Sequence, residues 1–297
     1  MELSIIVPCY NEELTIKTFY NKVVSICNEK NISYEIIFVD DGSSDSTMDE
    51  IKKLCLNDTN IHYLSFSRNF GKDSAILAGL KKAQGEYSVV MDADLQDPPE
   101  LLPEMIQIIK NSDIDCVETR RKTRKGEPVI RSLFAKIFCQ VMNAVSNVNI
   151  TDGIRDFRLM KKSMVDAIVS IKESNRFSKG LFSWVGFKTK CITYDNIERT
   201  AGCSKWSFWS LFKYAANGMI SFSTLPLYLP LIFGVLLFLG GLVGLIINFD
   251  SNRIFILSTM SIFFGLNSIF IGFLGLYLAK IHTETQKRPL YIIREEK

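Results

Sequence analysis

Two long stretches without a charged side chain lie in the last third of this 297-residue chain. They are Tyr214–Phe249 and Ile254–Ala279, and a short polar turn at 250–253 separates them. Each stretch exceeds the roughly 20 apolar residues that a helix needs to cross the hydrocarbon core of a bilayer. The sequence therefore predicts a two-helix hairpin in the membrane, at about 227–249 and 254–279, behind a soluble part of about 210 residues.

Basic residues flank the predicted hairpin and indicate its orientation. Lys205 and Lys213 precede it, and Lys280 and Lys287 are among the cations that follow it, whereas the turn between the helices carries Arg253. Segments with an excess of Lys and Arg stay in the cytoplasm, so both ends of the chain and its soluble part are expected there. The start of the chain lacks the basic and then apolar pattern of a secretory signal peptide.

Aromatic side chains gather just before the first charge-free stretch, with Trp206 and Trp209 among them. Such rings prefer the headgroup region of a bilayer. We therefore expect a soluble domain at 1–205, an interfacial amphipathic segment at 206–226, and the membrane hairpin with a short cytoplasmic tail at 227–297.

Composition excludes several classes of protein. The formal net charge of +3 and the absence of a basic tract with interleaved aromatic residues argue against a nucleic-acid partner. Seven scattered cysteines without a C-x-x-C pair argue against a zinc site or a disulfide framework, and most are expected in the core. Two histidines leave almost no material for a Ser-His-Asp triad or a His-rich metal site.

The first part of the chain alternates strand-like and helix-like segments. The strand-like segments are Leu3–Val7, Glu35–Val39, Ile61–Phe66 and Glu86–Val90, and the helix-like segments between them are Thr15–Asn28, Asp45–Cys55 and Asp73–Ala83. This alternation predicts an α/β fold with a mostly parallel sheet and right-handed crossovers. In such sheets the ligand binds beyond the carboxyl ends of the strands.

Polar clusters follow three of the predicted strands at that edge, at Pro8–Glu12, Asp40–Ser43 and Asp92–Asp94. Residues i and i+2 of an extended chain point the same way, so Asp92 and Asp94 are expected to face one cleft. Two carboxylates there suit a divalent cation that also binds substrate phosphates. An acidic turn that closes the strand is the alternative for this pair alone, but the convergence of three clusters favours a binding site.

These clusters carry a resemblance to a known family. The segments Pro8–Glu12, Val39–Asp45 and Asp92–Asp97 resemble the family 2 glycosyltransferases of GT-A fold. Within that family, further segments are similar to bactoprenol (undecaprenyl-phosphate) glucosyltransferases and dolichyl-phosphate mannose synthases: Arg68–Lys72, Arg176–Phe177, Gly180–Gly186 and Ala201–Lys205. The resemblance runs nearly end to end and includes the two charge-free stretches.

The resemblance implies a set of residues that bind the nucleotide sugar. They are Pro8, Tyr10, Glu12, Val39, Asp40, Asp41, Asp92, Ala93, Gln96 and Arg121. A carboxylate can accept a hydrogen bond from a base N–H or a ribose hydroxyl, and Tyr10 can contact the base. The alternative for Asp40–Ser43, which is compatible with this role, is a turn that caps the next helix.

The resemblance also implies a metal cofactor, Mg²⁺ or Mn²⁺. Asp94 is expected to contact the ion directly, and Asp92 and Gln96 are expected to contribute to its site. Such an ion neutralises a diphosphate leaving group.

On the acceptor side the resemblance implicates cations and a hydroxyl. Arg131 and Ser204 are expected to contact an acceptor phosphate, and Arg199 and Lys205 to close over the donor phosphates as catalytic residues. Arginine offers a planar fork that suits phosphate. The alternatives are a solvated loop for the basic stretch 120–125 and attraction to anionic lipid for Lys205.

Asp156 matches the aspartate that the resemblance nominates as the acceptor-side base. The residue before it is commonly glycine in relatives but is Arg155 here, which could lower the carboxyl pKa or occupy the path of the acceptor. A phosphate monoester has a second pKa near ~6 and is largely dianionic at neutral pH. We therefore expect Asp156 to orient the nucleophile, with general-base catalysis as the alternative.

The function implied is inverting transfer of a hexose, first of all glucose from UDP-glucose, to undecaprenyl phosphate at the cytoplasmic membrane face. GDP-mannose, UDP-galactose, UDP-GlcNAc or an aminosugar nucleotide are the alternative donors. A processive polysaccharide synthase and a non-catalytic membrane scaffold are the rival functions. Small residues at Gly240, Gly241 and Gly244 would allow helix association in a homo-oligomer within the membrane lipid.

Overall fold

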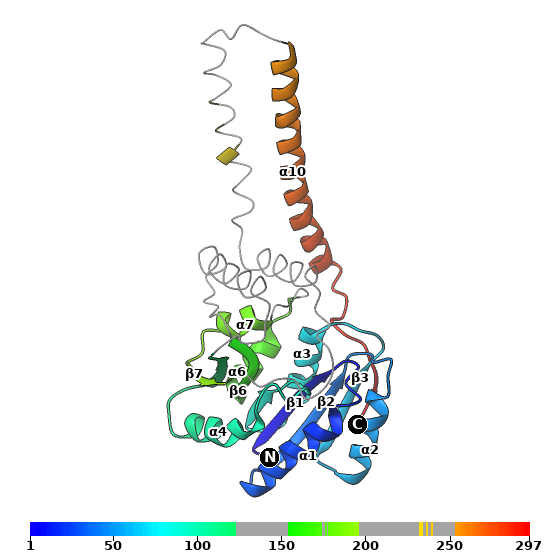
Figure 1. The fold of residues 1–297 in the computed structure, drawn as a ribbon, viewed down its shortest axis with the longest axis vertical. Coiled ribbons are helices and arrows are strands. Elements are labelled where there is room, and N and C mark those ends of the chain that lie inside the picture. Colours follow the sequence, from blue (N-terminus) through cyan, green and yellow to red (C-terminus); the bar gives the residue numbers. More distant parts are fainter. Residues whose placement is uncertain are drawn as a thin grey trace.

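The computed structural model of this chain describes residues 1–122, 154–173, 176, 178–195, 232, 233, 236, 239 and 253–297. The described part consists of an α/β body, in which helices cover both faces of one sheet, and a long helix that stands away from that body (Figure 1).

The sheet has eight strands in the order β7-β5-β6-β4-β1-β2-β3-β8. In chain order they are β1 (Leu3–Cys9), β2 (Tyr34–Asp40), β3 (Ile61–Phe66), β4 (Tyr87–Val90), β5 (Cys116–Arg121), β6 (Ile154–Lys161), β7 (Thr189–Tyr194) and β8 (Ile293–Glu296). Strands β1 to β4 run parallel, as do β5 and β7, whereas β6 and β8 run antiparallel to their neighbours. The prediction of an α/β fold with a mostly parallel sheet is confirmed.

The helices form two layers. One face of the sheet packs against α1 (Ile16–Glu29), α2 (Thr47–Asn57) and α4 (Leu102–Lys110), the last of which follows the short helix η1 (Pro99–Leu101). The other face packs against α3 (Lys72–Lys82), α6 (Lys162–Ser170) and α7 (Ser178–Trp184). The helices expected between the first four strands are therefore present, with ends within a few residues of those expected.

The central strands are buried on both faces because they lie between these layers. Along β1, Ile5 belongs to the core of one face and Ile6 to that of the other, as the two-residue period of a strand requires. A fully buried side chain of this size stabilises the folded state by about 1.5–3 kcal/mol relative to an exposed one. Helix α3 packs so closely on β1 that a Cβ at Gly79 would lie 2.3 Å from Cγ2 of Ile6. Of the five cysteines in the part of the chain that the structure describes, Cys191 is exposed and four are buried, as expected of core residues: Cys9, Cys27, Cys55 and Cys116.

Four strands, β5 to β8, were not among the predicted segments. Residues 293–296, which the sequence analysis placed in a short tail, form β8 and pair with β3 at the edge of the sheet. Glu295 forms an ion pair with Lys52 at 2.7 Å and accepts a hydrogen bond from Tyr63 Oη at 2.8 Å. The C-terminal end of the chain is thus part of the same body as its N-terminal strand.

The long helix α10 (Arg253–Thr285) contains the second predicted span. Its 33 residues extend about 50 Å, more than the thickness of a bilayer core. The stretch Ile262–Thr285 has the length and composition of a membrane span, with a mean hydropathy of 1.9. Most of the predicted interfacial segment and first span, at 206–226 and 227–249, lies outside the described residues.

Candidate active site

The loops that follow β1 and β2 are held together by hydrogen bonds. The backbone N–H of Asn11 donates to Ser43 Oγ at 2.9 Å, and the N–H of Ser44 donates back to Asn11 Oδ1 at 2.8 Å. The N–H of Glu12 donates to Thr47 Oγ1 at 2.7 Å. Asn11 has a φ of +53°, which asparagine tolerates better than most residues. The expectation that these two polar clusters lie together is confirmed.

Asp40 and Asp41, at the end of β2, are almost fully buried. Asp40 accepts hydrogen bonds from the N–H of Ser43 at 3.0 Å and from Ser65 Oγ at 2.9 Å. The predicted turn role of this cluster is therefore present, and Asp45 likewise accepts the N–H of Thr47 at the start of α2. The nucleotide contacts of these carboxylates stay predictions.

Asp41 fixes the next loop along the sheet. Its two carboxylate oxygens accept the backbone N–H groups of Phe70 at 2.6 Å and of Gly71 at 2.9 Å. Burial raises the pKa of the Asp41 carboxyl, although these two N–H groups act in the opposite direction. A Cβ at Gly42 would lie 2.5 Å from the carbonyl carbon of Arg68, so glycine is needed where the two loops touch. The start of α3 is thus set by contacts with the end of β2.

The segment after β4 makes a tight turn at Asp94. The Asp94 carboxylate accepts the N–H of Gln96 at 3.1 Å, and Leu95 between them has a φ of +58°. A bulky residue in this left-handed region costs about 1–3 kcal/mol and is found where surrounding contacts enforce it. Arg121, at the end of β5, donates from Nη2 to Gln96 Oε1 at 3.1 Å. Three predicted site residues, Asp94, Gln96 and Arg121, therefore lie close together.

A lysine that the sequence analysis did not assign to the site lies between two predicted site carboxylates. Lys72 Nζ is 2.7 Å from Asp92 Oδ1 and 2.8 Å from Asp156 Oδ2. Lys72 is the first residue of α3 and therefore lies at the same edge of the sheet as the three polar clusters. Its place at the end of the Arg68–Lys72 motif, after a strand, was the sequence signal that pointed to it.

Arg155 takes part in the same network of charges. Its Nε donates to Asp97 Oδ1 at 3.0 Å, and its Nη2 lies 3.7 Å from Asp92 Oδ2. Tyr194, the last residue of β7, donates its hydroxyl to the same Asp97 oxygen at 3.0 Å. Burial acts to raise the pKa of Asp92, but the positive charges of Lys72 and Arg155 outweigh it and the pKa is lowered. Asp92 therefore remains ionised.

The donor set at this edge fits a cation that shares its ligands with a substrate. Among the described residues, no group of three or more His, Cys, Asp and Glu side chains could enclose a metal ion. Mg²⁺ and Mn²⁺ bound beside a diphosphate need one or two carboxylates, because water and phosphate oxygens supply the rest. Asp94 and Asp92 can provide these, and Asp92 is also paired with Lys72 and Arg155.

The other sequence-predicted residues are placed as follows. Pro8 and Glu12 are half-buried, Val39 and Ala93 are buried, and the Tyr10 side chain is 38% exposed. Arg131, Arg199, Ser204 and Lys205 lie outside the described residues, so their roles stay predictions.

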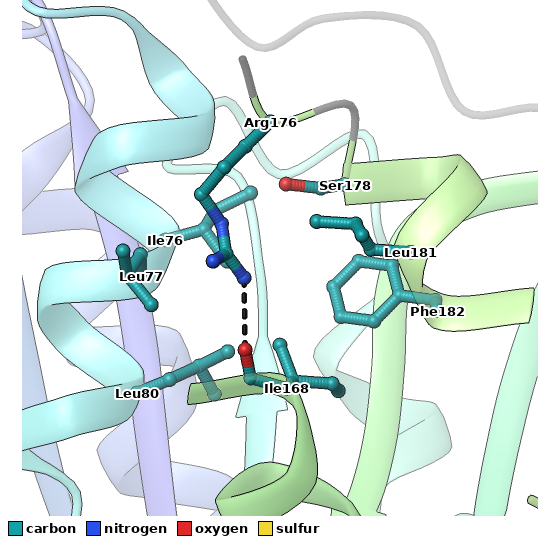
Figure 2. A pocket seen from close by; sticks show the side chains of 8 residues that line it. All are labelled: Ile76, Leu77, Leu80, Ile168, Arg176, Ser178, Leu181 and Phe182. Carbon is teal, nitrogen blue, oxygen red and sulfur yellow. Dashed lines mark hydrogen bonds between the residues drawn. The ribbon is translucent and has the colours of Figure 1, made fainter. Parts of the chain in front are cut away.

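Arg176, which belongs to one of the motifs that carry the resemblance, has a structural role. Its guanidinium points into a small apolar pocket between α3, α6 and α7 (Figure 2). There Nη2 donates to the carbonyl of Ile168 at 2.9 Å and Nη1 to that of Ile171 at 2.7 Å. Arginine thus satisfies carbonyl groups that the last turn of α6 leaves without helical partners.

Comparison with a solved structure defines the class of fold. The mannosyltransferase PcManGT of Pyrobaculum calidifontis, solved with GDP-mannose and Mn²⁺, aligns with a TM-score of 0.50 and 14% identity. The alignment covers 96% of this chain and 86% of that chain. The fold is therefore GT-A-like, with a mostly parallel mixed sheet.

Sequence comparison defines the family. The profile described as "Glycosyl transferase family 2" matches residues 4–169. CsbB of Bacillus subtilis, which carries the name of a glycosyltransferase, is 40% identical over 99% of this chain and 91% of its own length. The prophage bactoprenol glucosyl transferase homolog of Escherichia coli is 38% identical over the full length of both chains. The bactoprenol glucosyl transferase of Shigella phage SfV is 37% identical over 100% of this chain and 99% of its own. This chain belongs to glycosyl transferase family 2.

Proposed function

We propose that this glycosyltransferase transfers glucose from UDP-glucose to undecaprenyl phosphate at the cytoplasmic face of the membrane. The observation that carries the proposal is similarity over the whole chain, apolar C-terminal part included, to proteins named as bactoprenol glucosyl transferases. The similarity to these proteins thus includes both the predicted catalytic domain and the predicted membrane segments, which favours a lipid acceptor.

The donor would bind at the carboxyl ends of β1, β2 and β4. Asp94, with Asp92 and Gln96 beside it, would hold Mg²⁺ or Mn²⁺, and the bound ion would supply neutralisation of the diphosphate leaving group. Arg121, which donates to Gln96, would contact the same diphosphate. Arg199 and Lys205 would close over it from the segment before the membrane.

The membrane arrangement is supported by chain connectivity. Both β7 and β8 belong to the same sheet, although α10 lies between them in sequence. If α10 crosses the bilayer, residues 196–252 must cross it once more, because both ends of the connection stay on one side. Phe233 of the predicted first span lies beside Phe270 of α10, with ring centroids 6.0 Å apart. These observations support the predicted hairpin, with both of its ends on the side of the catalytic domain.

The reaction would be a single displacement with inversion at the sugar carbon. The acceptor phosphate is largely dianionic above its second pKa near ~6, so its oxygen can attack without a strong base. Asp156, held by Lys72 at 2.8 Å, would orient this nucleophile.

The test is transfer from radiolabelled nucleotide sugars to undecaprenyl phosphate by the purified full-length protein in detergent or proteoliposomes. The panel contains UDP-glucose, UDP-galactose, UDP-GlcNAc and GDP-mannose, and the Asp94→Asn variant is the control. We expect label in the lipid fraction with UDP-glucose. Lipid labelling with a different donor would contradict the sugar assignment, and none with any donor would contradict the lipid-linked reaction.

A further inference from the structure

Lys72 joins two carboxylates that come from opposite sides of the proposed reaction. Asp92 follows β4 on the donor side, whereas Asp156 lies on β6, on the proposed acceptor side. The Lys72 ammonium lies within 2.8 Å of an oxygen of each. A single cation at this place links the two halves of the site.

The position of the ammonium is set by the backbone as well as by the flexible side chain. Gly71, with a φ of +97°, turns the chain into α3, and Asp41 holds the N–H groups of Phe70 and Gly71. Lys72 therefore begins its helix from a loop that is fixed by a buried carboxylate. This loop and the two ion pairs keep the charge between Asp92 and Asp156.

The proposed reaction needs positive charge at this place. An acceptor phosphate dianion that approaches Asp156 would be repelled by its carboxylate, and the donor diphosphate adds further negative charge nearby. Arg155 lies 3.7 Å from Asp92 and also pairs with Asp97. The Lys72 ammonium lies directly on the Asp156 carboxylate, with Nζ 2.8 Å from Oδ2.

We propose that Lys72 is a positioning residue that neutralises Asp156 and Asp92 so that an anionic acceptor can approach the donor. The proposal rests on the proposed function, because it requires a phosphate acceptor. If Lys72 has this role, its loss should weaken the binding of the acceptor more than the binding of the donor.

The experiment compares Lys72→Met, Lys72→Arg and the double variant Lys72→Met/Asp156→Asn with wild type. Lys110→Met is the matched control, since Lys110 pairs with Glu2 at 2.7 Å on the far side of the sheet. Acceptor KM and kcat are measured with undecaprenyl phosphate, and donor Kd is measured by calorimetry with UDP-glucose and Mn²⁺ in the absence of acceptor.

We expect Lys72→Met to raise the acceptor KM about 10- to 100-fold and to change the donor Kd by less than about threefold. Lys72→Arg should keep the acceptor KM close to wild type because it keeps the charge. The double variant should bind acceptor better than Lys72→Met, because removal of the Asp156 charge removes the repulsion. A lysine that only stabilised the fold would give no such recovery.

The outcomes separate the two proposals. Wild-type protein that transfers no sugar to the lipid phosphate contradicts the proposed function and, with it, the role of Lys72. Wild-type protein that transfers sugar, beside a Lys72→Met variant with an unchanged acceptor KM, contradicts the role of Lys72 alone. An acceptor KM of Lys72→Arg that rises as much as that of Lys72→Met also contradicts it, because the positive charge would then not be what matters.

Discussion

At the scale of single residues, the site is a network of alternating charges. Asp156, Lys72, Asp92, Arg155 and Asp97 form a continuous series of ion pairs. Burial disfavours the charged form of a side chain, whereas an opposite charge in contact favours it. At Asp92 the second effect is larger, and its pKa is lowered. Removal of one member leaves a neighbouring charge without its partner. A single substitution here should therefore lower the free energy of unfolding by more than the ion pair itself contributes.

Asp94→Asn is expected to abolish sugar transfer while the protein still folds and inserts into the membrane. The change removes the charge that would hold a divalent cation but alters the volume little. Transfer is measured with radiolabelled donor, and thermal unfolding of the variant provides the control for folding. Full activity of the variant, or of wild type in excess EDTA, would show that no metal ion is required.

Asp156→Asn distinguishes a general base from a group that positions the acceptor. We expect the loss mainly in acceptor KM, with a pH profile unchanged above the phosphate pKa near ~6, because the acceptor supplies its own negative oxygen. The measurement is a pH-rate profile of wild type and variant. A loss of roughly 10²–10⁴-fold in kcat that recovers at high pH would instead identify a general base.

At the scale of elements, β8 connects the long helix to the catalytic body. Tyr291, just before β8, stacks on Phe66 of β3 with ring centroids 5.0 Å apart, and Phe66 contacts Phe70 edge to face at 5.8 Å. Phe70 belongs to the loop that leads to Lys72. The segment after α10 is therefore packed against the loop that carries a site residue, and it also covers the edge of β3.

Tyr291→Ala is expected to lower the melting temperature of the solubilised protein. Loss of the ring contact with Phe66 should cost about 1–2 kcal/mol, which corresponds to a shift of about 2–8 °C for a body of this size. The measurement is thermal unfolding in detergent, and Ile292→Ala is the matched control because Ile292 is 51% exposed. Equal melting temperatures for the two variants would show that the packing of Tyr291 contributes nothing.

At the scale of the whole molecule, the sheet determines how the chain can cross a membrane. The N–H of Lys297 donates to the carbonyl of Tyr63 at 3.1 Å, so the last residue is held beside the third strand. If the chain crosses a bilayer as proposed, both termini must then lie on the same side of it. The positive flanking residues predict that this side is the cytoplasm.

Reporter tags at Met1 and Lys297 are therefore expected to be cytoplasmic, and a tag in the turn at 250–253 to be outside. Accessibility of each tag to a membrane-impermeant reagent in intact and permeabilised cells measures this. The tag at Met1 serves as the internal reference, because it precedes every predicted span. Termini on opposite faces would contradict both the hairpin and the pairing of β8 with β3.

Features that depend on local pattern could be predicted from the sequence. Apolar runs and their spacing identified β1 to β4 and the helices between them, because a buried strand and an amphipathic helix each have a characteristic period. The same logic placed the polar loops at one edge of the sheet and predicted the apolar helix at 254–279. Each of these features depends on residues that are near one another in the chain.

Tertiary structure alone decided the contacts between distant segments. Lys72 lies 20 residues from Asp92 and 84 from Asp156, and no local pattern indicates that one ammonium bridges both. Strand β8 is a short polar segment whose partner, β3, is more than 200 residues away, so its pairing follows from packing and not from its own propensity. The charge network exists because folding brings these half-buried side chains together, where paired charges are more stable than single ones.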